Sequence, residues 1–273
     1  ASFLPRSERM IFVAYMVLGA IAGMLAGLFG IGGGIIVVPV LVLAFNLQGI
    51  NPEIVFYMAI ATSLANIIFT SLSAIRTHHK KAAIEWYLVK PIAVGMLGGS
   101  FIGVNTALTI PAIYLQASFG AFAIFLSLRM MFSQLGAGTL HLPGTLGLGV
   151  AGALIGWVSV LFGIGGGNLL VTWLSNRQLV IQKAVATASA CGFAIAISGA
   201  GSNAILGWGN PMLPPHSLGY IYLPALLGIV STSFVAAAYG SMLAHQLSPQ
   251  LLKRLFAWML LLMGLRMLIS VWF

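Results

Sequence analysis

Apolar residues run along most of the chain in continuous stretches, and polar residues occur mainly in the short segments between them. Eight stretches approach the roughly 20 residues that a helix needs to cross the hydrocarbon core of a bilayer. They cover residues 10–29, 53–75, 84–106, 112–133, 143–162, 184–206, 218–244 and 250–273. A membrane-spanning strand would instead alternate apolar and polar positions. The pattern therefore predicts an all-α bundle in a membrane and not a β-barrel.

Two further apolar stretches, residues 33–46 and 165–176, are too short to cross a bilayer comfortably. Each begins at a glycine cluster, residues 30–34 and 163–167, and both clusters read Gly-Ile-Gly-Gly-Gly. A glycine inside a helix costs about 1 kcal/mol relative to alanine, so a helix is not stable across such a cluster. We predict a helix break at each cluster, followed by a half-helix that either spans the membrane or is re-entrant.

The two glycine clusters belong to an internal duplication. Residues 19–41 match residues 152–174 at 12 of 23 positions, and shorter matches continue toward the end of each half. We therefore predict two repeats, residues 1–140 and 141–273, within one membrane domain of eight to ten helices. Because the first apolar stretch is part of the first repeat, we do not expect it to be a cleavable signal.

Composition agrees with a membrane location and adds information about the substrate. Hydrophobic residues make up 60% of the chain and charged residues 5%, and the mean hydropathy is +1.07. The formal net charge is +9, and the acidic side chains are Glu8, Glu53 and Glu85, all in predicted tails or loops. Carboxylates inside a bundle are the usual means of binding sodium or relaying protons. Their absence disfavours a cation as substrate and favours an anion.

Positive charge is concentrated in one set of loops and helix ends. Its members are Arg76, Lys80, Lys81, Lys90, Arg129, Arg177, Lys183, Lys253 and Arg254. By the positive-inside rule these positions are cytoplasmic, and the loops near 46–52, 106–111 and 206–217, which lack Lys and Arg, face outward. The two repeats then have opposite orientations, provided that each pair of segments flanking a glycine cluster enters and leaves on one face. Arg6 and Arg9 lie outside in this arrangement, against the rule.

Inverted repeats with broken helices are the architecture of many secondary transporters, in which the breaks meet near the middle of the membrane and bind the substrate. A break frees backbone N–H groups, which a bilayer tolerates only where they line a cavity or contact protein. The arm after the break presents the positive end of its helix dipole, which attracts an anion without a charged side chain. The duplication therefore predicts an anion site between the two glycine clusters.

Candidate ligands of the anion come from the clusters and from the helices that follow them. They are the backbone amides of Gly32, Gly33, Gly34, Gly165, Gly166 and Gly167 and the side chains of Thr62, Ser63, Asn66, Asn168, Thr187 and Ser189. Two alternatives stay open. The hydroxyls only bond to their own helix, or the glycines only allow close helix packing, as we expect for Gly19, Gly23, Gly27, Gly95, Gly99 and Gly103. A dinucleotide fingerprint is excluded, because its third glycine is missing from both clusters.

Arg129 and Arg266 are a duplicated pair of cations near the ends of their apolar stretches. We predict that they attract the anion electrostatically; the alternative is that they only extend to the membrane surface. Cys191 is expected to be a packing residue. No metal or other cofactor is expected, because the chain contains no HExxH or phosphate-binding motif. Its histidines also lie in predicted loops and not inside the membrane.

Several motifs together resemble one family. Leu-Phe precedes each glycine cluster, Pro39 follows the first, and Ala61-Thr62-Ser63-Leu64 comes further on. With these motifs nearly the whole chain resembles the sulfite exporter TauE/SafE family, also called the toluenesulfonate uptake permease family. The resemblance implies export of small organosulfur anions, such as sulfite, sulfoacetate or related sulfonates, across the bacterial cytoplasmic (inner) membrane. The second repeat departs from the motif at Thr172 and Ala188, where a proline and a serine would parallel the first.

We therefore expect a multi-pass secondary transporter, and not an enzyme, that exports an organosulfur anion by alternating access. Its expected partners are that anion and the lipid bilayer, without nucleic acid; the small-residue faces are compatible with a homodimer and equally with internal packing. An anion channel or facilitator is the main alternative. An intramembrane enzyme is a weaker one, because no nucleophile has a membrane-embedded histidine partner in the sequence. The exact anion, its direction and the coupling ion stay open.

Overall fold

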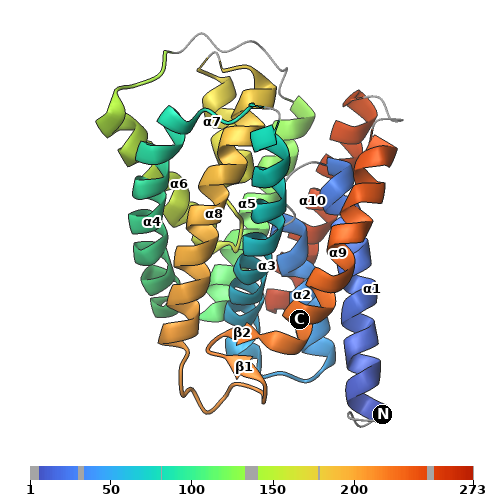
Figure 1. Cartoon of the computed structure of the whole chain (residues 1–273). Coiled ribbons are helices and arrows are strands. Elements are labelled where there is room, and N and C mark those ends of the chain that lie inside the picture. The colour runs from blue at the N-terminus through green and yellow to red at the C-terminus, as the bar shows by residue number, and fades with distance from the viewer. Residues whose placement is uncertain are drawn as a thin grey trace.

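The computed structural model describes residues 6–29, 34–80, 82–132, 141–177, 179–244 and 249–272. Within these ranges the chain forms ten helices and one small two-stranded sheet (Figure 1). The helices of the first half are α1 (Arg6–Phe29), α2 (Gly34–Leu47), α3 (Pro52–Lys80), α4 (Trp86–Thr109) and α5 (Ala112–Phe132). The second half contains α6 (Thr145–Leu161), α7 (Gly167–Ser175), α8 (Ile181–Leu206), β1 (Ser217–Leu218), β2 (Ile221–Tyr222), α9 (Leu223–Ala244) and α10 (Pro249–Trp272).

The observed helices follow the predicted apolar stretches closely, and the prediction of a mostly helical membrane protein is confirmed. Among the described residues, four helices are long and apolar enough to cross a membrane, namely α3, α4, α5 and most of α8. The small sheet was not predicted from the sequence. It occupies the beginning of the stretch 218–244, where Ser217 pairs with Tyr222 and Leu218 with Ile221 before α9 starts.

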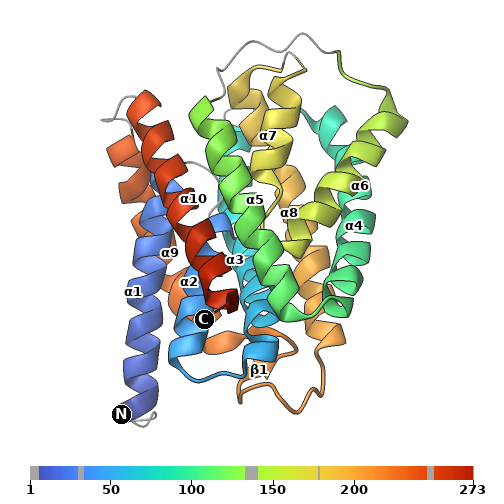
Figure 2. The same cartoon turned by 180° about the vertical axis from the view of Figure 1, so that it is seen from behind.

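Helices from the two halves pack against each other in matched pairs. The most extensive contacts join α1 to α9, α4 to α6, α5 to α10 and α3 to α8. The duplication relates α1 to α6 and α4 to α9, so the first two pairs are counterparts of each other. The pairs α3–α8 and α5–α10 each join a helix to its own counterpart (Figures 1 and 2).

Glycines allow the backbones of these pairs to come close. A Cβ atom on Gly99 of α4 would lie 2.0 Å from the carbonyl oxygen of Ala153 in α6, and one on Gly95 would lie 2.0 Å from that of Gly149. In the counterpart pair, a Cβ on Gly23 of α1 would lie 2.5 Å from the Cα of Ser233 in α9. Real Cβ atoms are not found at such distances. The prediction that these glycines serve close packing is confirmed.

The segments flanking the two glycine clusters enter the bundle from opposite ends. Helix α1 begins and α2 finishes at the lower end in Figure 1, whereas α6 begins and α7 finishes at the upper end. The connections α2–α3, α4–α5 and α8–β1, which are the loops predicted to face outward, also lie at the lower end. At about 1.5 Å per residue, the nine residues of α7 span only about 14 Å, so α7 does not cross a bilayer.

Candidate functional site

The second glycine cluster forms a buried, non-helical link between α6 and α7. Gly163 has φ +64° and Gly166 has φ +68°, both in the left-handed region that side chains other than glycine rarely adopt. Within the link, the N–H of Ile164 donates to the carbonyl oxygen of Ser159 at 2.8 Å. Gly166 is the N-cap residue of α7, and Gly167 is its first helical residue. The predicted helix break at residues 163–167 is confirmed.

The break leaves the beginning of α7 with free backbone donors. Within the described part of the chain, no acceptor is paired with the N–H groups of residues 165–169; the first paired amide is that of Leu170, which donates to the carbonyl oxygen of Gly166 at 2.9 Å. Free N–H groups at a helix start, together with the helix dipole, make a region of positive potential. That region lies inside the bundle, because α7 begins there (Figure 1).

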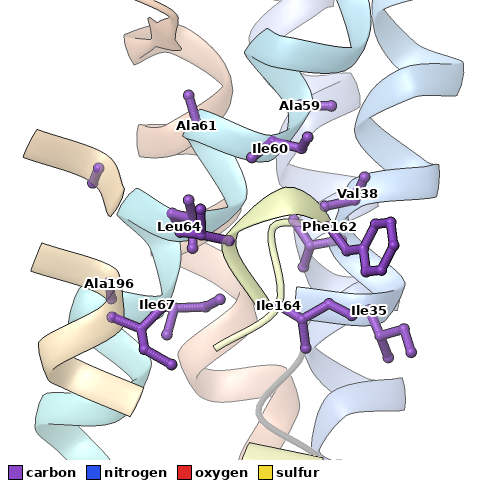
Figure 3. Packing of buried hydrophobic residues seen from close by; sticks show 14 of the residues in the cluster. Ile35, Val38, Ala59, Ile60, Ala61, Leu64, Ile67, Phe162, Ile164 and Ala196 are labelled. Carbon is purple, nitrogen blue, oxygen red and sulfur yellow. The ribbon is translucent and has the colours of Figure 1, made fainter. Parts of the chain in front are cut away.

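The beginning of α2 meets the link from the other half. Gly32 and Gly33 lie outside the described residues, but Gly34 starts α2 and is buried. A Cβ on Gly34 would lie 2.8 Å from the carbonyl oxygen of Gly163 and 3.1 Å from the Cα of Ile164. Figure 3 shows Ile35 and Val38 of α2 on one side of the link and Leu64 and Ile67 of α3 on the other. The start of α2 therefore packs on the second cluster.

A small cavity of about 80 Å³ adjoins the link and the start of α7. Three chain segments line it with regularly spaced residues. They are Ile67, Thr70, Ser71 and Ala74 from α3, then Gly165, Gly167, Asn168 and Val171 from the link and α7, and Val185, Ala188, Ser189 and Gly192 from α8. The residues on α3 and on α8 each occupy positions i, i+3, i+4 and i+7, which is one face of a helix. None of the lining residues carries a formal charge.

One side chain of this cavity offers a free hydrogen-bond donor. The side-chain nitrogen of Asn168 is buried and has no partner among the described residues. Ser189 donates to the carbonyl oxygen of Val185 at 2.9 Å, and Thr70 to that of Ile67 at 3.3 Å, each within its own helix. A buried donor without an acceptor costs about 1–3 kcal/mol, so the Asn168 nitrogen favours an acceptor entering the cavity.

Four of the residues predicted from sequence therefore line one cavity: Gly165, Gly167, Asn168 and Ser189. Thr70 and Ser71 were missed. They lie seven and eight positions after Ser63, and residues at this spacing share one face of a helix. The position of Ser63 was therefore the available signal for Thr70 and Ser71.

The other predicted ligands lie in the core but do not line the cavity. Thr62 accepts a hydrogen bond from the N–H of Tyr222 at 3.1 Å, and Ser63 donates one to the carbonyl oxygen of Gly163 at 2.9 Å. Thr187 accepts one from the N–H of Glu85 at 3.2 Å. All three side chains are fully buried. In this conformation the three hydroxyl groups are hydrogen-bonded to backbone groups of neighbouring segments.

Two further predicted positions, Asn66 and Gly166, also lie outside the cavity lining. Asn66 is 2% exposed and its side-chain oxygen has no partner among the described residues. Gly166 is buried, and a Cβ there would lie 2.5 Å from Ile195 and 3.2 Å from the hydroxyl oxygen of Ser159. That hydroxyl is itself buried and without a described partner. Ser159 was not predicted, because a single serine in an apolar helix gives no signal in the sequence.

The two duplicated arginines lie away from this cavity. Both Arg129 and Arg266 are exposed. Arg129 lines a different, larger hollow of about 340 Å³ between α5, α6 and α7. Arg266 lies on α10, outside the lining of either hollow. In this conformation the two arginines would act on an anion in the cavity only through long-range electrostatic attraction.

Comparisons with known proteins identify the family. The family model described as "Sulfite exporter TauE/SafE" matches residues 15–267. A "Probable membrane transporter protein" of Haemophilus influenzae is 36% identical over 259 residues, covering 93% of this chain and 97% of the relative. The probable membrane transporter protein YunE of Bacillus subtilis is 32% identical over 222 residues, covering 74% of this chain and 81% of the relative.

A more distant relative comes from an archaeon. A probable membrane transporter protein of Methanocaldococcus jannaschii is 27% identical over 259 residues, covering 93% of this chain and 94% of the relative. No solved structure matches the chain significantly. The family match extends over both glycine clusters and over every helix from α2 to α9. The chain therefore belongs to the sulfite exporter TauE/SafE family and is a multi-pass membrane transporter.

Proposed function

We propose that this transporter carries a small sulfur-containing oxyanion, sulfite or a short sulfonate such as sulfoacetate, and binds it in the cavity at the start of α7. The supporting observation is a set of free donors on residues that line this cavity: the amides of Gly165, Gly167 and Asn168 and the side-chain nitrogen of Asn168. Oxyanions accept hydrogen bonds through every oxygen, and helix starts bind them without a cationic side chain. The absence of carboxylates among the lining residues removes the main source of repulsion.

The size of the cavity supports a compact substrate. A cavity volume of about 10–15 Å³ holds one water molecule, so the cavity of about 80 Å³ has room for several waters or for a small oxyanion. Sulfite fits this volume. A short sulfonate would place its sulfonate group in the cavity and its remaining atoms toward the opening.

The mechanism that we propose is alternating access between two inverted repeats. Two observations support it. The helix pairs α1–α9 and α6–α4 are counterparts of each other, and the α1–α2 and α6–α7 segments enter the bundle from opposite ends (Figure 1). Transporters of this architecture move one repeat against the other around a central site. The pairs that join counterpart helices, α3–α8 and α5–α10, would then lie on the axis between the moving parts.

The cavity lies on only one side of the glycine link, and this asymmetry supports a conformation that is open toward the cytoplasm. Its lining comes from the second half of α3 and the first half of α8, which join the loops that the positive-inside rule assigns to the cytoplasmic side. The duplication relates Ser189 to Leu64. Ser189 lines the cavity, whereas Leu64 is fully buried against the link (Figure 3). At this position the outer half of the pathway is filled by an apolar side chain.

The first experiment measures thermal stabilisation of the purified protein by sulfite, sulfoacetate, taurine, sulfate and acetate. A ligand that binds only the folded state stabilises it by about 2.7 kcal/mol at 100 times its Kd. We expect sulfite or sulfoacetate to raise Tm in the wild type and the effect to be lost in Asn168→Ala. The control is Asn105→Ala, since Asn105 is exposed on α4 and donates within its own helix. Stabilisation by acetate alone, or an unchanged response of Asn168→Ala, contradicts the proposal.

A channel would bind the anion with the same donors but would stay open to both sides of the membrane. Binding does not distinguish it from a carrier, so flux must be measured as well. In proteoliposomes loaded with unlabelled sulfite, a carrier accelerates entry of labelled sulfite by exchange, and its rate saturates with concentration. A channel gives a flux that does not depend on sulfite on the opposite side. Accelerated exchange is the result we expect.

A further inference from the structure

The second hollow, of about 340 Å³, lies on the other face of α7 from the anion cavity. Three helices form it, and Figure 2 shows α7 between α5 and α6 toward the upper end of the bundle. Its floor and walls are mainly apolar and include Leu154 and Val158 of α6 and Leu169 of α7. Leu154 is 60% exposed, so the hollow opens toward the surroundings of the bundle, which are lipid for a membrane protein.

The polar residues of this hollow are gathered at one end. Arg129 lies in the last turn of α5, and Thr172 and Asn176 lie at the end of α7. The apolar residues lie deeper: Leu169 near the start of α7, and Leu154 and Val158 in the second half of α6. The hollow is therefore a groove with an apolar body and a polar mouth, and the positive-inside rule assigns the mouth to the cytoplasmic end.

Positive charge is concentrated at the mouth. The exposed guanidinium of Arg129 lines it, and Arg177 follows directly after Asn176. Arg177 donates to the carbonyl oxygen of Trp173 at 3.2 Å, and its guanidinium stacks 3.8 Å from the centre of the indole ring. The groove lining contains no acidic residue, and the ion pair seen among the described residues, Lys183 with Glu85, involves other elements. The mouth therefore matches an anionic group.

We propose that this groove binds an anionic phospholipid of the cytoplasmic leaflet. Its phosphate would lie beside Arg129 with Thr172 and Asn176 as further hydrogen-bond partners, and one acyl chain would pack against Leu154, Val158 and Leu169. Basic pockets between helices on the cytoplasmic side are suited to anionic headgroups, and tryptophan is enriched at this depth of a membrane. An ion without an acyl chain would leave the apolar body of the groove unfilled, which is why a lipid fits better than free phosphate.

The test uses the full chain, purified in detergent and stripped of lipid, with native mass spectrometry and Tm as readouts. Phosphatidylglycerol, phosphatidylcholine and soluble glycerol phosphate are added separately. Arg129→Gln removes the cation at the mouth, and Leu154→Trp fills the apolar body at an exposed position. Arg266→Gln is the matched control, because it removes the duplicated arginine, which lies outside the groove.

We expect phosphatidylglycerol to bind the wild type and Arg266→Gln alike, and to bind Arg129→Gln and Leu154→Trp at least tenfold more weakly. We expect phosphatidylcholine to bind weakly to all of them. Equal loss in Arg129→Gln and Arg266→Gln would overturn the assignment of the site. Equal binding of phosphatidylcholine would show ordinary lipid contact, and equal binding of glycerol phosphate would show a polar anion site; either result overturns the proposal.

Discussion

The hydroxyl of Ser63 donates a hydrogen bond of 2.9 Å to the carbonyl oxygen of Gly163. This bond joins α3 of the first half to the glycine link of the second half. Gly163 has a left-handed backbone conformation, and its carbonyl oxygen also faces Gly34 at the start of α2. Three segments are therefore fixed around one carbonyl group. In this conformation the Ser63 hydroxyl supports the fold of the site and is not directed at the cavity.

Ser63→Ala should destabilise the protein by about 1–3 kcal/mol, because it leaves the buried carbonyl oxygen of Gly163 without its donor. The measurement is Tm in detergent. Ser118→Ala is the control, since Ser118 is exposed and donates only to Leu115 of its own helix. Equal Tm values for the two variants would mean that another group replaces the Ser63 hydroxyl.

Neighbouring glycines of α4 should respond in opposite ways to alanine. In Gly99→Ala the new Cβ would lie 2.0 Å from the carbonyl oxygen of Ala153, so α4 and α6 must separate and we expect a loss of several kcal/mol, beyond the about 1–3 kcal/mol typical of overpacking. In Gly98→Ala the Cβ meets nothing within 4 Å, and the higher helix propensity of alanine should stabilise by about 0.5–1 kcal/mol. Thermal unfolding of both variants checks this pair; similar values would contradict the close α4–α6 packing.

The sequence was sufficient to predict most of the helices and the helix break at residues 163–167; residues 30–33 of the first cluster lie outside the described residues. Hydrophobic stretches mark helices strongly in a membrane protein, because a spanning segment must satisfy its backbone hydrogen bonds internally. The break at the second cluster was predictable because clustered glycines destabilise a helix. The β1–β2 hairpin was not predictable in this way. Its residues Leu218, Ile221 and Tyr222 continue the apolar stretch of α9, and hydropathy does not distinguish a strand from the first turn of a helix.

The lining of the cavity was predicted only in part. Asn168, which follows the second glycine cluster, and Ser189, which lies on the helix after it, were both named from the sequence and both line the cavity. Thr62, Ser63 and Thr187 were predicted on the same grounds but are bonded to the backbone of other segments. A buried hydroxyl pairs with whichever donor or acceptor tertiary packing brings to it, and the sequence of one helix does not contain that information.

Gly167→Leu should abolish anion binding without unfolding the protein. A Cβ at Gly167 meets nothing within 4 Å, and the residue lines the cavity, so the leucine side chain would occupy space that the anion needs. Gly201→Leu is the matched control on α8, because its Cβ also meets nothing within 4 Å and the residue lies outside the cavity lining. We expect Tm close to that of the wild type in both and loss of the sulfite-induced rise only in Gly167→Leu. A normal sulfite response in Gly167→Leu would place the anion elsewhere.

Phosphatidylglycerol should raise the affinity for the anion if both proposed sites are correct. Helix α7 carries Asn168 toward the cavity and Leu169, Thr172 and Trp173 toward the groove, so a lipid in the groove supports the helix that presents the anion ligands. Isothermal titration with sulfoacetate, with and without the lipid, should show a several-fold decrease in Kd for the wild type and none for Arg129→Gln. An unchanged Kd together with normal lipid binding would mean that the two sites are independent.

Cysteine accessibility at one pair of equivalent positions should distinguish the two sides of the pathway. The duplication relates Ser189, which lines the cavity, to Leu64, which is fully buried. In a Cys191→Ala background, we expect Ser189→Cys to react with a small, charged thiol reagent added from the cytoplasmic side and to be protected by sulfoacetate, which does not consume the reagent. Leu64→Cys should stay unreactive from both sides at rest and become reactive from outside only when substrate drives turnover. Reaction of Leu64→Cys from outside at rest would indicate a pathway open at both ends, as in a channel, and would contradict alternating access.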